Sequence, residues 1–207
     1  MMTIFFDISE LKHVASIAKV NSKDRSCELR NVYLILRNGR VYLAALDGHS
    51  MAIYCRDGNT TQKNATFSLS WENVLTLTSI KAKIPSISFS FDDDSCKVEY
   101  VGFSCHAQKE EAGNFIENIF ARIEGTARHG KLIMSKALHI VGSKQLQYVF
   151  PGNTAQLEIV QPADNPSGFQ LCTDPNFPNF CAVLMPIMAT KERMGKAIKQ
   201  TRAFFSA

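Results

Sequence analysis

Three short stretches of the sequence carry side chains that could do chemistry. They are His49 in ALDGHSMAIY, the adjacent pair Cys105 and His106, and the acidic run at 92–94. A hydrolase needs a nucleophile, a base and an orienting acid that converge in space. A divalent metal ion needs several oxygen ligands around one point. The types of residue therefore allow a hydrolytic or a metal site, and their positions have to decide.

The positions favour neither chemistry. Successive strand residues point to opposite faces, so Cys105 and His106 cannot form a nucleophile and base couple with each other. His49 follows a turn without a fixed partner, which favours a role in packing or at the rim of a site. Three consecutive carboxylates in a turn usually face water. We predict no catalytic residue, no metal and no cofactor, and a hydrolase that uses His49 or Cys105 stays as the enzyme alternative.

Composition indicates a cytoplasmic globular protein of one or two compact domains. The chain has 207 residues, of which 45% are hydrophobic and 20% charged, which is ordinary for such proteins. No apolar run approaches the ~20 residues of a membrane span, and the start MMTIFFDISE lacks the features of a secretory signal. Six cysteines without metal-ligand spacing are expected to be reduced and mostly buried. The net charge of +4 is compatible with nucleic acid as a partner without requiring it.

The first 55 residues predict a strand, a helix and three further strands. The strands are expected at 4–6, 31–37, 40–46 and 49–55, and the helix over 7–20, capped by Asp7 or Ser9. The dipeptides at 38–39 and 47–48, Asn-Gly and Asp-Gly, favour tight two-residue turns. The core-facing residues of the helix are Ile8, Leu11, Val14, Ala15 and Ala18, and Lys12, Ser16 and Lys19 lie on the opposite face.

The same order of elements follows twice more. In the second unit a strand at 67–69 precedes a helix from Ser70 to Ile80 with apolar Val74, Leu75 and Leu77, and strands at 86–91, 97–100 and 103–109 follow. In the third, a strand at 131–134 and a helix over 135–146 precede strands at 155–160, 169–173 and 181–187. The sequence therefore predicts an α+β fold of repeated βαβββ units, with antiparallel sheets and helices on one side. The predicted domains are 1–113 with two units, a linker at 114–130, a single unit at 131–188 and a basic C-terminal helix at 189–207.

Three of these stretches resemble the bacterial DNA sliding clamp, the polymerase III beta subunit family. LRNVYLILRNGRVYLAALDGHSMAIY is similar to a middle-domain stretch that ends in Thr-Asp-Gly-His-Arg-Leu, with Leu46, Ser50 and Met51 replacing Thr, Arg and Leu. AGNFIENIFARI occupies the place of the Gly-x-Phe-Pro-x-Tyr link between domains, with Ile116 in place of proline. CAVLMPIM resembles the family's C-terminal strand. The resemblance covers about residues 4–188 and implies a shortened, divergent member that lacks the first domain and half of the last.

The resemblance also implies a site for partner proteins. In the family, these stretches converge on an apolar groove that binds short linear motifs of DNA polymerases and repair proteins, and glycine turns beside methionine suit an extended peptide. The alternative is that these residues form an ordinary core at a domain junction. The implied peptide-binding residues are Leu29, Leu46, Gly48, His49, Met51, Ile116, Phe120, Val183, Met185, Pro186 and Ile187.

Finally, the resemblance implies non-specific binding of double-stranded DNA by basic helices. We expect a non-enzymatic processivity factor for replication or repair, a homo-oligomer in which four chains would supply the twelve helices of a ring. The alternative is an open clamp-fold module, phage- or plasmid-borne, that binds clamp-interacting proteins without encircling DNA. The implied DNA-binding residues are Lys12, Lys19, Lys81, Lys83, Lys136 and Lys144, and the C-terminal helix adds Lys196, Lys199 and Arg202.

Overall fold

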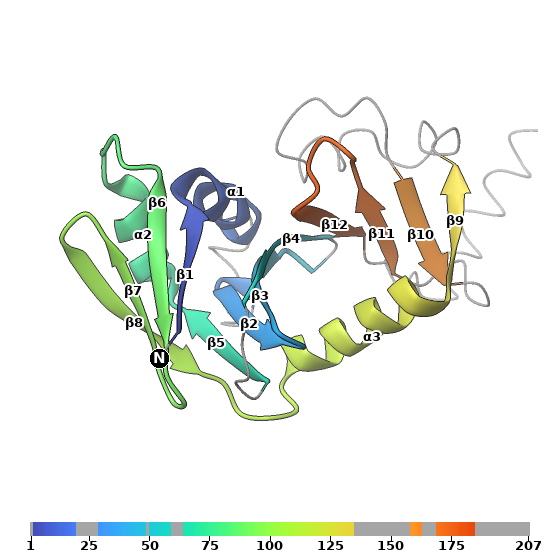
Figure 1. Ribbon diagram of the computed structural model, residues 1–207, viewed down its shortest axis with the longest axis horizontal. Coiled ribbons are helices and arrows are strands. Elements are labelled where there is room, and N and C mark those ends of the chain that lie inside the picture. Colours follow the sequence, from blue (N-terminus) through green and yellow to red (C-terminus); the bar gives the residue numbers. More distant parts are fainter. Residues whose placement is uncertain are drawn as a thin grey trace, which may run out of the picture.

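A computed structural model describes residues 2–19, 29–48, 50–58, 64–134, 158–162 and 169–184. They form twelve strands and three helices (Figure 1). The helices are α1 (Ile8–Lys19), α2 (Trp71–Ser79) and α3 (Phe115–His129). The strands are β1 (Met2–Asp7), β2 (Val32–Arg37), β3 (Arg40–Leu46), β4 (Ser50–Asp57), β5 (Ala65–Leu69), β6 (Ser86–Phe91), β7 (Cys96–Tyr100), β8 (Phe103–Lys109), β9 (Gly130–Met134), β10 (Glu158–Pro162), β11 (Gln170–Thr173) and β12 (Phe180–Leu184).

All twelve described strands belong to one antiparallel sheet, in the order β1-β6-β7-β8-β5-β2-β3-β4-β12-β11-β10-β9. The order confirms the first two predicted units, because β2, β3 and β4 are neighbours and so are β6, β7 and β8. In the third unit, β9 is the strand before the predicted helix, and β10, β11 and β12 are the three strands after it. The helices predicted over 135–146 and 189–207 lie outside the described residues.

Helices α1 and α2 lie together on one face of the sheet and close the first core. Helix α1 contacts β1 at one edge and β2, β3 and β4 further along, so the sheet curls around it (Figure 1). Leu11, Val14 and Ala18 are buried there as predicted, while Lys12 is exposed. Ser70 accepts a hydrogen bond from the Asn73 amide and caps α2. The predicted α+β class, with antiparallel strands and the helices of the first two units on one side, is confirmed.

Most of the segment predicted as a linker at 114–130 is the fifteen-residue helix α3. Asn114 caps it by accepting a hydrogen bond from the Glu117 amide at 2.9 Å, as short polar side chains do at helix starts. Its buried residues recur at helical spacing, and they pack on the face of the sheet opposite to α1. They are Ile116, Ile119, Phe120, Ile123 and Thr126. The repeat therefore carries an additional helix, on the second face.

Strands β2, β3 and β4 are consequently covered on both faces. Leu34 and Leu43 belong to the first core, under α1 and α2, whereas Ile35 and Ala44 belong to the second core, under α3. A strand that is buried on both faces shows a continuous apolar run instead of an alternating pattern. This explains the runs YLIL and LAAL in the sequence.

The two hairpin turns differ from each other. Asn38 and Gly39 have φ of 52° and 76°, which is the predicted tight turn of two left-handed residues. In the next turn the Asp47 amide donates to the Ser50 carbonyl at 3.0 Å, so Gly48 is the first central residue and the predicted position was wrong by one. The Asp47 carboxylate shifts the turn because it accepts hydrogen bonds from the Ser50 amide and hydroxyl, at 2.7 and 3.1 Å.

Among the described residues, no helix has both the length and the apolar character to cross a membrane.

Candidate functional site

The sheet places three of the predicted peptide-binding residues in one straight row. Leu46 of β3 pairs with Met51 of β4, and Met51 pairs with Val183 of β12. The row continues through Leu171 of β11, Val160 of β10 and Leu132 of β9, which follow in register. We call these six side chains the apolar row. It arises because an in-register residue on each neighbouring strand points to the same face.

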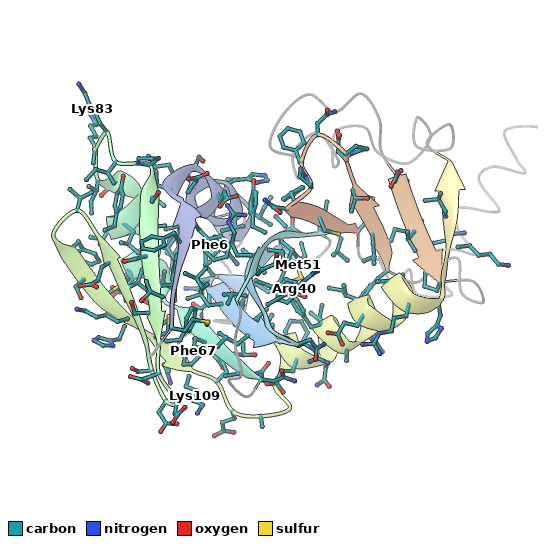
Figure 2. All side chains as sticks on the ribbon, in the orientation of Figure 1. Phe6, Arg40, Met51, Phe67, Lys83 and Lys109 are labelled. Carbon is teal, nitrogen blue, oxygen red and sulfur yellow. The ribbon has the colours of Figure 1, made fainter. Side chains whose placement is uncertain are left out.

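Helix α3 covers most of the apolar row. Leu46, Met51 and Val183 have no exposed surface, and Ile116 and Phe120 of α3 are 2% and 3% exposed. All five belong to the second core, which occupies the middle of the molecule around Met51 (Figure 2). These five predicted peptide-binding residues therefore lie together, and they lie in a buried core. Such a core is the alternative that the sequence analysis considered for them.

Two further predicted residues lie at the margin of this core. Leu29 is partly buried and packs against it, and Gly48 is exposed with φ of +86°. A Cβ atom at Gly48 would stand 3.8 Å from Leu29 Cδ1, so the two are neighbours. The positions of His49, Met185, Pro186 and Ile187 lie outside the described residues.

An ion pair fastens α3 to the β2–β3 hairpin. Arg37 donates from Nε to Glu124 Oε1 at 2.7 Å and from Nη2 to Glu124 Oε2 at 3.0 Å. The Asn38 side chain donates to Glu124 Oε1 at 3.1 Å. We call Arg37, Asn38 and Glu124 the latch. The two charged side chains are 21% and 25% exposed, and such bidentate pairs are stronger than single contacts.

Aromatic contacts support the same helix. The rings of Tyr42 and Phe120 meet edge to face with centroids 5.3 Å apart, and Arg122 lies 5.9 Å above the ring of Phe169. Burial raises the pKa of Tyr42, with smaller effects from its charged neighbours. Of these four residues the sequence predicted a role only for Phe120, and the periodicity of α3 was the one signal that could have pointed to its buried side.

Cys105 and His106, the two described residues considered for catalysis, do not form a nucleophile and base couple. Cys105 points toward the first core and His106 is exposed on the other face, as predicted. Burial raises the pKa of the Cys105 thiol to about 11, which keeps it protonated and a poor nucleophile at neutral pH. The five described cysteines, Cys55, Cys96, Cys105, Cys172 and Cys181, are free thiols.

In the acidic run at 92–94, the Asp92 carboxylate forms hydrogen bonds within its own turn. Asp92 accepts hydrogen bonds from the Ser95 hydroxyl at 2.7 Å and from the amides of Ser95 and Asp94 at 2.6 and 3.0 Å. These bonds, with the hydroxyl first, lower the pKa of Asp92. Asp94 pairs with Lys109 at 2.6 Å. Within the described ranges, no group of three or more His, Cys, Asp or Glu residues is placed to hold a metal ion.

The face that carries α1 and α2 presents exposed lysines. Lys12 is exposed on α1, and Lys81 and Lys83 are exposed just after α2, with Lys83 projecting from the end of the molecule distant from α3 (Figure 2). Glu10, the acidic residue in the first turn of α1, is held by Arg56 at 2.7 Å. The structure describes the backbone of Lys19, whereas Lys136, Lys144, Lys196, Lys199 and Arg202 lie outside the described part.

Comparison with known proteins identifies the fold. No family model and no curated protein matches the chain. The DNA polymerase III subunit beta from Pseudomonas aeruginosa matches with a TM-score of 0.57 at 11% identity, over 91% of this chain and 67% of that one. The beta subunit from Thermotoga maritima matches with a TM-score of 0.57 at 12% identity, over 92% of this chain and 66% of that one. The beta subunit from Borrelia burgdorferi matches with a TM-score of 0.53 at 15% identity, over 92% of this chain and 65% of that one. The chain thus has the fold of these subunits and spans about two thirds of their length.

Proposed function

We propose that this protein is a sliding-clamp-like accessory factor for DNA replication or repair, which acts without catalysing a reaction. The observation that carries the proposal is the shared fold: nine tenths of the chain superposes on DNA polymerase III beta subunits. The exposed Lys12 on the face that carries both α1 and α2 supports it, because lysines on such a face can meet phosphates of duplex DNA without reading its sequence.

Binding of this kind is weak for each contact and sensitive to salt. Each phosphate that a lysine neutralises contributes a slope of about −0.9 to the logarithm of the binding constant against the logarithm of salt concentration. Three exposed lysines, Lys12, Lys81 and Lys83, therefore contribute a slope of about −2.7 per chain if all three contact DNA. The remaining proposed contacts, Lys19, Lys136, Lys144, Lys196, Lys199 and Arg202, would add to it.

Encirclement of DNA requires several copies. The chain has two thirds of the length of the beta subunits it resembles in fold, and we propose a homo-oligomeric ring, with four chains as the count that three units per chain suggest. Light scattering coupled to gel filtration measures the assembly directly. A monomer at micromolar concentration would remove the ring and leave an open module that binds partner proteins.

Retention on DNA tests the function itself. The full chain is assembled on nicked circular DNA and on the same DNA after linearisation, and the bound protein is measured after gel filtration in moderate salt. A ring stays on the circle and is lost from free ends. Equal loss from both forms contradicts encirclement, and no binding to either form at low salt contradicts the DNA function as a whole.

We also propose that partner proteins bind where the second core meets the surface near Leu29 and Gly48. The support is that these two residues are neighbours and border the buried Leu46 and Met51. His49 is assigned to this site as a rim residue and not as a catalyst. His49→Ala should then weaken partner binding, whereas an esterase or peptidase activity that disappears in this variant would favour the hydrolase alternative.

A further inference from the structure

The apolar row and α3 are of similar length, and α3 crosses the strands that carry the row. From β3 to β9 the row crosses five strand spacings, or about 24 Å, and a fifteen-residue helix is about 22 Å long. Helix α3 crosses β11 and β10 and ends at β9, which follows it directly (Figure 1). Glu124, in the C-terminal half of α3, meets Arg37 at the β2–β3 hairpin. The helix therefore lies across the strands and covers the row from Leu46 to Val160, whereas Leu132 at the β9 end is 63% exposed.

The side chains that α3 lays on the row follow a regular pattern. Ile116, Ile119, Phe120 and Ile123 stand at i, i+3, i+4 and i+7, which is the spacing by which amphipathic helices bind apolar grooves. Glu124 follows at i+8 and enters the latch. The pattern defines a ligand: a helix with four apolar anchors on one side and a carboxylate next to the last of them.

We propose that the apolar row is a docking surface for amphipathic helices, that α3 is its resident occupant, and that a partner helix with the same pattern displaces α3. This inference rests on the proposed partner-binding function of the same site, and it changes the expected ligand from an extended peptide to a helix. Such a partner replaces the contacts of α3 one for one, including the ion pair with Arg37.

The two ends of α3 are held differently, which sets how it leaves. At the C-terminal end Gly130 is wedged in, since a Cβ atom there would stand 2.5 Å from Val160 Cγ1 and 2.7 Å from the Gln161 carbonyl. At the N-terminal end Gly113 is exposed with φ of +78°, and its amide donates to Glu117 of α3 itself. Residues 115–124, which carry the four apolar anchors and Glu124, are therefore the part that lifts, with Gly130 as the fixed end.

The test uses the full chain and a fluorescent synthetic peptide of residues 114–130, NFIENIFARIEGTARHG. Glu124→Gln in the protein removes one charge of the latch and leaves Arg37 available to the peptide. We expect this variant to bind the peptide about fivefold more tightly than wild type, the effect of roughly 1 kcal/mol for a partly exposed pair. A peptide that carries Gln at the position of Glu124 should lose this gain in affinity on the same protein variant.

The matched control is Glu10→Gln, which breaks the comparable Glu10–Arg56 pair on the other face of the sheet. It should bind the peptide as wild type does, which separates release of α3 from general loosening. If Glu124→Gln fails to fold, Asn38→Gly serves instead, because glycine keeps the left-handed turn and removes the amide donor to Glu124.

Hydrogen exchange decides whether the peptide takes the place of α3. Bound peptide should increase exchange in residues 115–124 of α3 and leave α1 protected. Equal affinities of wild type and Glu124→Gln, absence of binding to both latch variants, or binding that leaves α3 protected would each overturn the inference. Retention on circular DNA is independent of these outcomes, so a failure of the DNA function is recognised separately.

Discussion

Gly130 offers the sharpest test of how α3 is seated. The residue joins α3 directly to β9, with φ of −74° and ψ of 162°, a conformation that alanine adopts without strain. Only the surroundings therefore oppose a side chain. A Cβ atom would collide with the Thr126 carbonyl and would stand 2.5 Å from Val160 Cγ1 and 2.7 Å from the Gln161 carbonyl.

The expected cost of Gly130→Ala follows from these contacts. Overpacking of a close-packed site costs about 1–3 kcal/mol, and the upper part of that range applies because two of the three contacts are backbone carbonyls that cannot rotate away. Alanine also lowers the conformational entropy of the unfolded chain, which offsets about 0.4–1 kcal/mol of this destabilisation. The net loss is about 2 kcal/mol, or roughly 4–8 °C in the midpoint of thermal unfolding for a chain of this size.

Gly125 supplies the matched control within the same helix. A Cβ atom there has nothing within 4 Å, so Gly125→Ala should stabilise α3 by about 0.5–1 kcal/mol. Circular dichroism melts and urea unfolding of both variants measure the difference. The two Gly→Ala changes should shift stability in opposite directions. A Gly130→Ala protein as stable as wild type would refute the close seating of α3 and β9 against β10.

Three further perturbations test other parts of the structure. Val101 is a β-branched residue with φ of 46° in the β7–β8 turn, so Val101→Asn should raise the free energy of unfolding by about 1 kcal/mol in a urea titration. Burial raises the pKa of Cys105 from 9.0 to about 11 and that of Cys172 from 9.0 to about 12. Because the thiols of the unfolded chain ionise first, the free energy of unfolding should fall as pH rises above about 9. A free energy of unfolding that stays constant from pH 8 to 10.5 would contradict the burial of these thiols. The double variant Lys81→Gln, Lys83→Gln should bind DNA with a weaker dependence on salt. The slope of the logarithm of the binding constant against the logarithm of salt concentration should decrease in magnitude by about 1.8, at about 0.9 for each phosphate that is no longer neutralised. An unchanged slope would show that neither lysine contacts DNA.

Local signals in the sequence predicted most of the first two units. The Asn38-Gly39 turn, the Ser70 cap and the periodicity of Leu11 and Val14 each depend on residues a few positions apart, and the structure contains all of them. The Asp47 turn shows the limit of such signals. Its register depends on whether the carboxylate reaches the Ser50 amide, which the Asp-Gly pair alone does not determine.

The second core could not be obtained in the same way. Ile116, Ile119 and Phe120 show helical spacing, but the resemblance to a clamp's interdomain link assigned their segment to a linker, and the periodicity was not used. The latch joins residues 87 positions apart, and no local pattern connects Arg37 with Glu124. The apolar row likewise exists only once six strands are in register.

The double-sided burial of β2, β3 and β4 explains how α3 could leave without unfolding the protein. Neighbouring residues such as Leu34 and Ile35 face different cores, so the first core under α1 and α2 keeps its own set of side chains. The strands also stay paired on both edges, with β5 beyond β2 and β12 beyond β4. Displacing α3 then exposes one face of an intact sheet, and a partner helix that covers the apolar row restores the buried area that α3 gives up.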